Sequence, residues 1–333
     1  MTEYKGIKGG KVQNYDTDPG NPYVGQVWYN QNLGDLRVRS TTLTSAWATG
    51  GNLNTARGQN VSGAGTQTAG LAFGGSDTAV VALTESYNGS SWTEVNDLTT
   101  ATKQLAGDGT QTSALAFGGE TATESETANT QSWNGTSWTE LNNLNTARRQ
   151  LAGVGADNTT ALATGGWDGT AETAVTESWN GTSWTEVNDL NTARRLLSSA
   201  GTQTAALAFG GQTPTFTGAT ESWNGTSWFE VNDLNTARAQ LAGAGTNTSA
   251  LAFGGATPTI TAVTESWNGS IWTETNDLNT ARSSLMGTGS QTAALAAGGG
   301  TPAVVPNTEE WNANYAYGVW ATGGSLNTAR NSL

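Results

Sequence analysis

The amino-acid sequence predicts an all-β fold, a β-propeller, and three features lead to this expectation. A segment of about 45 residues recurs along the 333-residue chain, and a fixed period of this length is typical of propeller blades. Each copy holds four short runs with strand character, separated by turn residues. Tryptophan, with 14 residues in all, recurs in pairs within the copies. Large rings at regular intervals favour a packed, turn-rich β protein over a disordered chain.

The start of each copy is marked by the string Leu-Asn-Thr-Ala-Arg. Between four consecutive copies the arginine is spaced by 46, 44 and 44 residues, and Thr102 takes its place in one copy. The equivalent arginines are Arg57, Arg148, Arg194, Arg238, Arg282 and Arg330.

One copy shows the expected strands. After Leu190 we expect strand a at 196–200, strand b at 205–209, strand c at 219–223 and strand d at 227–231. Strand a consists mostly of small residues, which suits strands crowded around a central axis, while the Trp residues of strands c and d suit the wider outer gaps.

The turn between strands c and d is predicted from a recurring Asn-Gly pair, such as Asn224-Gly225. Both residues tolerate positive φ, so we expect a two-residue type I′ hairpin. The last copy has Asn312-Ala313 instead, and its turn should differ.

The two ends of the chain decide the predicted blade count. Residues 25–30 and 36–39 alternate around Gly34-Asp35 and predict a hairpin, and 45–49 predicts a third strand. Residues 326–333 match the entry into strand a.

These fragments predict a shared last blade. Three N-terminal strands and one C-terminal strand would complete seven blades, with six blades as the alternative. We expect residues 1–22 to form a polar N-terminal arm and 23–333 the propeller.

The composition of the chain disfavours several classes of partner and of chemistry. The net charge of −13 disfavours nucleic acid as a partner, since phosphate backbones are repelled. The chain has no Cys and no His, which removes thiolate chemistry and the commonest general base and metal ligand. Its start lacks a signal-peptide pattern, and no apolar run reaches the length of about 20 residues that spans a bilayer. We expect neither secretion by a signal peptide nor membrane insertion.

The repeats resemble the kelch repeat in three positions of each copy. Gly210-Gly211 after strand b, Trp228 in strand d and Arg238 before strand a carry the resemblance. The usual Tyr of strand c is Trp here except at Tyr87, and the common His after the Arg is missing. The c–d hairpin also resembles the sialidase Asp-box, which is a structural hairpin.

A second resemblance lies in the N-terminal segment GQVWYNQNLGDLRVR, which is similar to segments of bacteriophage tail-fibre and structural proteins. With its near-identical repeats, the chain resembles kelch-like proteins of marine phages. This resemblance implies a virion component, made in the host cytoplasm, that contacts the host.

The repeated residues allow both a functional and a structural interpretation. A ring of Arg offers an anion site, but a Glu recurs in strand c, and an internal Arg–Glu pair is the interpretation we favour. The Trp pairs are expected to fill the core rather than stack on sugars. Asp residues before Leu in the d–a connections offer Ca²⁺ ligands, but we favour Asx turns. These Asp residues are Asp97, Asp189, Asp233 and Asp277.

Binding residues are expected in the b–c loops, which vary while the strands repeat. In a four-stranded blade the b–c and d–a loops emerge on one face, and varied loops on a regular frame favour recognition. Trp167 has no counterpart in other copies. The variable loops cover 76–82, 120–130, 167–175, 212–218, 256–262 and 300–306, and the candidate ligand contacts are Glu120, Trp167, Asp168, Phe216 and Thr259.

The sequence therefore predicts a non-catalytic binding or structural propeller of a phage particle, with no cofactor and no metal. The expected partner is a host-surface glycan or protein, or another virion protein. Two alternatives remain: a carbohydrate-active enzyme of the sialidase or lyase type, working through paired carboxylates, and a purely architectural module.

Overall fold

The computed structural model describes residues 13–20, 26–33 and 35–322 of the chain. These residues form 30 β-strands and no helix. They divide into two units: one is formed by residues 45–313 and the other draws on both ends of the chain. Strands β3 (Asp35–Thr49) and β30 (Thr308–Thr322) contribute residues to both units.

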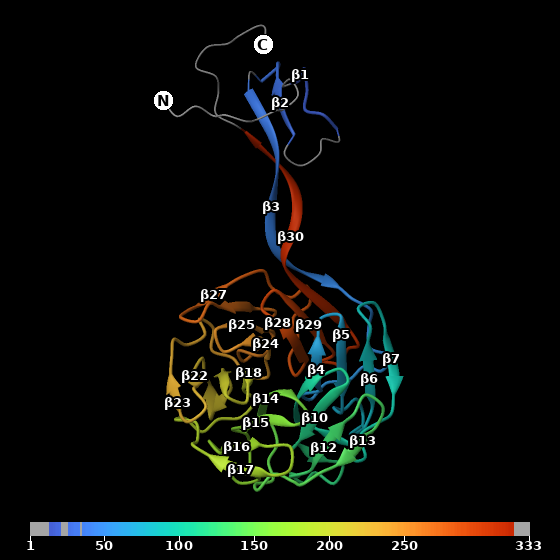
Figure 1. The fold of residues 1–333 in the computed structure, drawn as a ribbon, viewed down its shortest axis with the longest axis vertical. Helices are drawn as coiled ribbons and strands as arrows, with labels where there is room; N and C mark the ends of the chain where they lie inside the picture. The colour runs from blue at the N-terminus through green and yellow to red at the C-terminus, as the bar shows by residue number, and fades with distance from the viewer. Residues whose placement is uncertain (1–12, 21–25, 34, 323–333) are drawn as a thin grey trace. The chain divides into compact units, whose positions relative to one another are not determined.

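Residues 45–313 form a ring of six sheets with four strands each (Figure 1). In five sheets the four strands follow one another along the chain and pair antiparallel. The fold is a six-bladed β-propeller.

Blade 1 comprises β4 (Ser62–Thr66), β5 (Ala69–Phe73), β6 (Thr84–Tyr87) and β7 (Trp92–Val95). Blade 2 comprises β9 (Ala106–Thr110), β10 (Ser113–Phe117), β12 (Thr130–Trp133) and β13 (Trp138–Glu140). Blade 3 comprises β14 (Ala152–Asp157), β15 (Thr160–Thr164), β16 (Thr176–Trp179) and β17 (Trp184–Val187). Blade 4 comprises β18 (Ser198–Thr202), β19 (Ala205–Phe209), β22 (Thr220–Trp223) and β23 (Trp228–Glu230). Blade 5 comprises β24 (Ala242–Thr246), β25 (Ser249–Phe253), β26 (Thr264–Trp267) and β27 (Trp272–Glu274).

Blade 6 joins the two ends of the propeller. Strands β28 (Met286–Ser290), β29 (Ala293–Ala297) and β30 supply its inner three strands, and β3 supplies the outermost. The Ser45 hydroxyl donates to the carbonyl of Ala313 at 3.0 Å. An N-terminal strand therefore supplies the outer strand of the last sheet and closes the ring.

The preference for seven blades is wrong, and so is the predicted closing blade of three N-terminal strands and one C-terminal strand. The structure has the alternative count of six, closed by one N-terminal and three C-terminal strands. The reason lies at Asn312-Ala313, where the missing glycine leaves no residue suited to the tight c–d turn. The chain continues straight through as β30, and β3 takes the vacant outer position. Residues 326–333 lie outside the described part of the chain.

Within the repeats the expected strands are confirmed to within two residues at each end. In blade 4, β19 matches the predicted 205–209, and β18 begins and ends two residues later than predicted. The type I′ hairpin is wrong. Trp223 pairs with Trp228 across a four-residue loop, and only Gly225 in it has positive φ. The Asn224 side chain stabilises this loop by accepting the N–H groups of Thr226 and Ser227, both at 2.9 Å.

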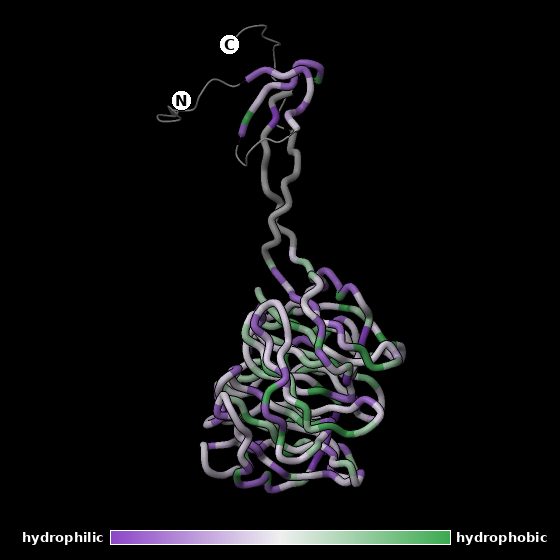
Figure 2. Tube along the Cα trace, turned by 90° about the vertical axis from the view of Figure 1, so that its right-hand side faces the viewer, coloured by the Kyte–Doolittle hydropathy of each residue, from purple (hydrophilic) through white to green (hydrophobic). Residues whose placement is uncertain are grey.

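The core lies between adjacent blades. One cluster combines Leu207 and Phe209 of blade 4 with Ala250, Trp267 and Trp272 of blade 5, and all five side chains are buried. The Trp pairs thus fill the gaps between sheets, as the sequence predicts. Hydrophobic and hydrophilic segments alternate over short lengths of the propeller in Figure 2, as expected where short strands alternate with surface loops.

The second unit contains two short N-terminal strands that extend the pairing of β3. Strand β1 (Gln13–Tyr15) pairs parallel with β2 (Val27–Asn30), and β2 pairs antiparallel with the start of β3, which confirms the predicted hairpin. The Asp18 carboxylate accepts hydrogen bonds from Asn30 at 2.8 Å and Trp28 at 3.0 Å. The Asn30 bond is the main cause that lowers the pKa of Asp18. Within the described residues, no helix is long and apolar enough to cross a membrane.

Candidate functional site

The loop face of the propeller carries the b–c and d–a loops of every blade. Adjacent blades are joined there by one repeated bond, in which the second Gly after strand b donates its N–H to the carbonyl of the residue at the Arg position of the next blade, which is Thr102 in blade 2. Gly255, for example, donates to Arg282 at 2.9 Å. A Cβ on the preceding Gly254 would lie 2.6 Å from the same carbonyl oxygen, and its φ is +65°. The Gly-Gly pair therefore allows the close approach of two backbones.

The repeated Arg residues are internal. Arg57, Arg148, Arg194, Arg238 and Arg282 are 0% exposed, and each pairs with the Glu of strand c in its own blade. Burial is the main cause that lowers the pKa of Arg238, and the charge of Glu265 opposes this effect. A guanidinium without solvent access cannot meet an external anion, so the structural interpretation of these five arginines is confirmed. Arg330 lies outside the described residues.

Blade 2 lacks this ion pair and has neutral residues at both positions. Thr102 takes the Arg position and Gln131 the Glu position. Gln131 accepts the backbone N–H of Thr99 at 2.8 Å and its hydroxyl at 3.0 Å. Both charges have been lost together, as expected if a buried charge requires its partner.

A closed ring of backbone hydrogen bonds surrounds the axis on the loop face. Each blade contributes a residue with φ near +55° that donates its N–H to the carbonyl of its counterpart in a neighbouring blade. In blades 2 to 6 these residues are Gln104, Gln150, Leu196, Gln240 and Ser284. Blade 1 has one extra residue, so Gln59 supplies the carbonyl and Asn60 the N–H.

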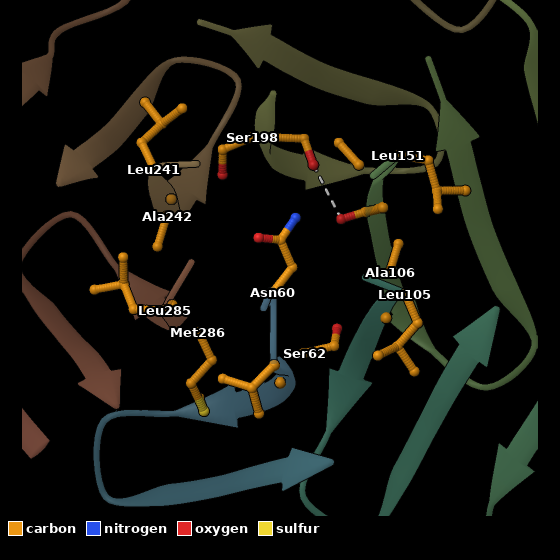
Figure 3. A pocket seen from close by; sticks show the side chains of 18 of the residues that line it. Asn60, Ser62, Leu105, Ala106, Leu151, Ser198, Leu241, Ala242, Leu285 and Met286 are labelled. Carbon is orange, nitrogen blue, oxygen red and sulfur yellow. Dashed lines mark hydrogen bonds between the residues drawn. The ribbon is translucent and has the colours of Figure 1, made fainter. Parts of the chain in front are cut away.

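Asn60 fills the mouth of the axial channel. Figure 3 shows its amide pointing to the centre of a cavity of about 110 Å³, with Ser62, Ala106, Ser198 and Met286 around it. A second chamber of about 180 Å³ is lined mainly by glycine backbone of the inner strands. The axial space is thus small and partly filled by a side chain, and it suits water better than an organic ligand.

The second chamber contains one carboxylate, Asp108 of β9. Its two oxygens accept the N–H groups of Gly109, at 2.6 Å, and of Gly155 in the next blade. The residue borders the chamber and is only partly buried, but its carboxyl group is enclosed by neighbouring protein atoms. This enclosure raises the pKa of Asp108 to about 7, against the two hydrogen bonds, which lower it. The equivalent residues in other blades are Ala64, Val154, Ala200, Ala244 and Thr288.

The side chains of the loop face differ strongly between blades. The residue after the entry Arg pairs with the residue after the Gly-Gly in an antiparallel bridge, once in each blade. In blades 2, 3 and 4 these pairs contain charged and aromatic residues, whereas the other three contain only Gly, Ala and Ser. The pairs, from blade 1 to blade 6, are Gly58/Ser76, Lys103/Glu120, Arg149/Trp167, Arg195/Gln212, Ala239/Ala256 and Ser283/Gly300.

Glu120 lies inside this network and is 3% exposed. It forms ion pairs with Lys103, at 3.1 Å, and with Arg149. Burial acts to raise the pKa of Glu120, but the hydrogen bonds and charges of Lys103 and Arg149 outweigh it and hold that pKa below its usual value. The sequence predicts Glu120 as a ligand contact, whereas in the structure its carboxylate holds two cations in place.

Trp167 is half-buried and stacks with a neighbour. The guanidinium carbon of Arg195, from blade 4, lies 4.8 Å from its ring centroid. Asp168 is exposed, and the Thr170 hydroxyl and the N–H groups of Thr170 and Ala171 lower its pKa by hydrogen bonding. Phe216 is half-buried in the two-stranded sheet of β20 (Gln212–Thr213) and β21 (Thr215–Phe216), and Thr259 is exposed in blade 5.

The structure therefore brings Glu120 and Trp167 into neighbouring, interlocked loops and places Phe216 and Thr259 in other blades. Sequence reasoning missed Lys103, Arg149 and Arg195 as face residues. Their signal was present, since the residue directly after the entry Arg changes from Gly, Ala or Ser to a cation in three consecutive copies.

The Asp residues of the d–a connections and the paired Trp residues of the blades have internal partners. Asp277 accepts the backbone N–H of Thr264 at 3.0 Å, and Asp97, Asp189 and Asp233 make the equivalent bond. The indole of Trp228 donates to Thr176 in the preceding blade at 3.2 Å. Among the described residues there is no group of three or more His, Cys, Asp or Glu side chains placed to hold a metal ion.

No protein-family model matches the chain, and a search of curated proteins finds no match. The assignment as a β-propeller follows from the strand topology and the repeated four-stranded blades alone.

Proposed function

We propose that the chain is a non-catalytic recognition module of a bacteriophage particle, a kelch-type propeller whose loop face binds a molecule on the surface of the host cell. One observation carries the proposal. In six nearly identical blades, the bridge positions after the entry residue and after the Gly-Gly carry charged and aromatic side chains in blades 2 to 4 only. Internal packing explains residues needed once per blade, but it gives no reason for this asymmetry.

The frame is suited to binding without rearrangement. Backbone bonds between blades hold the loops at both the Gly-Gly and the axial ring. A face that is already ordered loses little conformational entropy when a partner binds. The repeated carboxylates support a non-catalytic role, because the Glu of strand c and the Asp of the d–a loops already have structural partners.

The placement in a virion rests on the resemblance of residues 25–39 to phage tail-fibre and structural proteins. It is tested by immunogold electron microscopy of the particle that encodes the chain. We expect gold on the particle surface; label confined to infected-cell lysate, with none on purified particles, would refute a virion role.

Recognition is tested by binding of the fluorescently labelled protein to intact cells of the host. We expect binding that Trp167→Ala reduces at least tenfold. Thr182→Ala, in the exposed c–d turn on the opposite face, is the matched control and should leave binding unchanged. Equal binding by the unaltered protein, Trp167→Ala and Thr182→Ala would show that the loop face is not the recognition surface.

A further inference from the structure

The polar side chains of blades 2 to 4 form one interlocked network. Arg149 of blade 3 reaches back to Glu120 and Glu126 of blade 2, the latter at 3.4 Å. Arg195 of blade 4 reaches back in the same way to Glu172 of blade 3, at 3.4 Å. Each arginine is thus fixed by a carboxylate of the preceding blade, and the three loops are held together.

This network has no net charge of its own. Lys103, Arg149 and Arg195 balance the charges of Glu120, Glu126 and Glu172. The side chains remain partly accessible, with 25% exposure for both arginines and 24% for Glu172. A fixed and neutral array of N–H donors and carboxylate acceptors suits hydroxyl groups, each of which both donates and accepts a hydrogen bond.

Trp167 adds an apolar surface to the same sector. Arg195 stacks on the ring at 4.8 Å and fixes its orientation. Because the indole is half-buried, part of it remains open to solvent. A rigid aromatic ring beside planar polar groups suits a pyranose, whose C–H face is apolar and whose rim carries hydroxyl groups.

A cavity of about 280 Å³ lies next to the network, between the b–c loops of blades 1 and 2. Its lining includes Gln59, Asp77, Thr78, Lys103 and Glu124, with Ala79 and Val80 as apolar wall. It is the size of a small-ligand site and combines both types of hydrogen-bonding group with a small apolar surface.

We propose that the sector of blades 1 to 4 binds a neutral glycan, with one sugar ring at Trp167 and another in the cavity beside Lys103. This inference rests on the proposed host-surface recognition and names its ligand class. Neutral glycans fit because the three cations of the network are already matched by carboxylates, and Asp77, Glu124 and Asp168 add negative charge to the sector. Together with the net charge of −13 on the chain, this excess repels sulfated, sialylated and other anionic glycans.

The test is an array of neutral and acidic glycans probed with the full chain. We expect signals on neutral glycans that persist at high salt, followed by titration calorimetry with the strongest of them. Trp167→Ala should weaken binding at least tenfold, and Trp167→Phe, which keeps an aromatic surface, only a few-fold. Thr78→Trp, which fills the cavity, should also weaken binding.

Ala303→Ser is the matched control, since Ala303 is exposed on the same face in blade 6 and outside the proposed sector. Signals on acidic glycans alone, or equal loss with Ala303→Ser and Trp167→Ala, would overturn the inference. Cell binding that a protease treatment of the cells abolishes, with an empty array, would overturn the glycan assignment and leave host recognition standing. Absence of both cell and array binding would refute both proposals.

Discussion

The indole nitrogen of Trp47 donates a hydrogen bond to the hydroxyl of Thr264, 217 residues later in the chain, at 3.2 Å. Every other blade makes the same bond with the Trp of its own outer strand, as Trp272 does with Thr220. Trp47 also packs against Phe253 of blade 5 and Trp311 of blade 6. An N-terminal residue thus supplies the side chain that blade 6 lacks.

Trp47→Ala should therefore destabilise the whole ring. Truncation of a buried Trp typically costs about 3–5 kcal/mol, and here the loss falls on side-chain contacts that tie β3 to blades 5 and 6. We expect the free energy of unfolding from urea titration to fall by this amount. Trp272→Ala is the matched comparison, and an effect of Trp47→Ala much smaller than that of Trp272→Ala would show that closure by β3 is dispensable.

Arg238→Ala should lower stability without a direct effect on binding. Removal of one partner leaves the buried Glu265 uncompensated, at a typical cost of about 3–5 kcal/mol. The double variant Arg238→Thr/Glu265→Gln, which copies the two neutral residues of blade 2, should recover much of the loss. Thermal melting and urea titration measure the stability of the single and the double variant. An unchanged melting temperature with lost ligand binding would contradict the structural role.

The reverse exchange in blade 2 gives an independent test of the same pairing. Thr102→Arg alone places a charge opposite neutral Gln131 and should be strongly destabilising. Adding Gln131→Glu restores the pair found in the other five blades and should raise the melting temperature again. Equal melting temperatures of the single and double variants would show that the two positions are not coupled.

Asp108→Ala should change the pH dependence of stability. A carboxyl with a folded pKa of about 7 and an ordinary value of 3.8 binds its proton more tightly in the folded state. The contribution of this carboxyl to folding stability is therefore present at low pH and is lost as the pH rises from 3.8 through 7. At pH 8 the wild type encloses a costly carboxylate, so we expect Asp108→Ala to melt a few degrees higher there.

That advantage should vanish near pH 4, where the wild-type carboxyl is protonated. Thermal melts between pH 4 and 8 measure the difference between the two proteins. Val154→Ala, at the equivalent position of blade 3, serves as a control without a titrating group. A melting difference that is constant over this range would contradict the raised pKa of Asp108.

The repeated elements could be predicted because their determinants are local. The four-strand pattern, the internal Arg–Glu pairs and the Trp core all follow from residues that recur in fixed order, such as Arg238, Glu265 and Trp272. A role that must be filled once per blade leaves the same trace in every copy, so comparing copies within one sequence reveals it.

The blade count and the face network were decided by tertiary structure. Whether Trp47 or a residue after Trp311 completes blade 6 depends on which strand docks there, and that contact joins residues more than 200 positions apart. The roles of Glu120 and Trp167 likewise depend on cations of neighbouring blades, Arg149 and Arg195. Sequence alone determined a ring of near-identical sheets, because period and pattern are properties of a segment. Only the closed ring determined how its ends meet and which side chains face each other, because those are properties of distance in space.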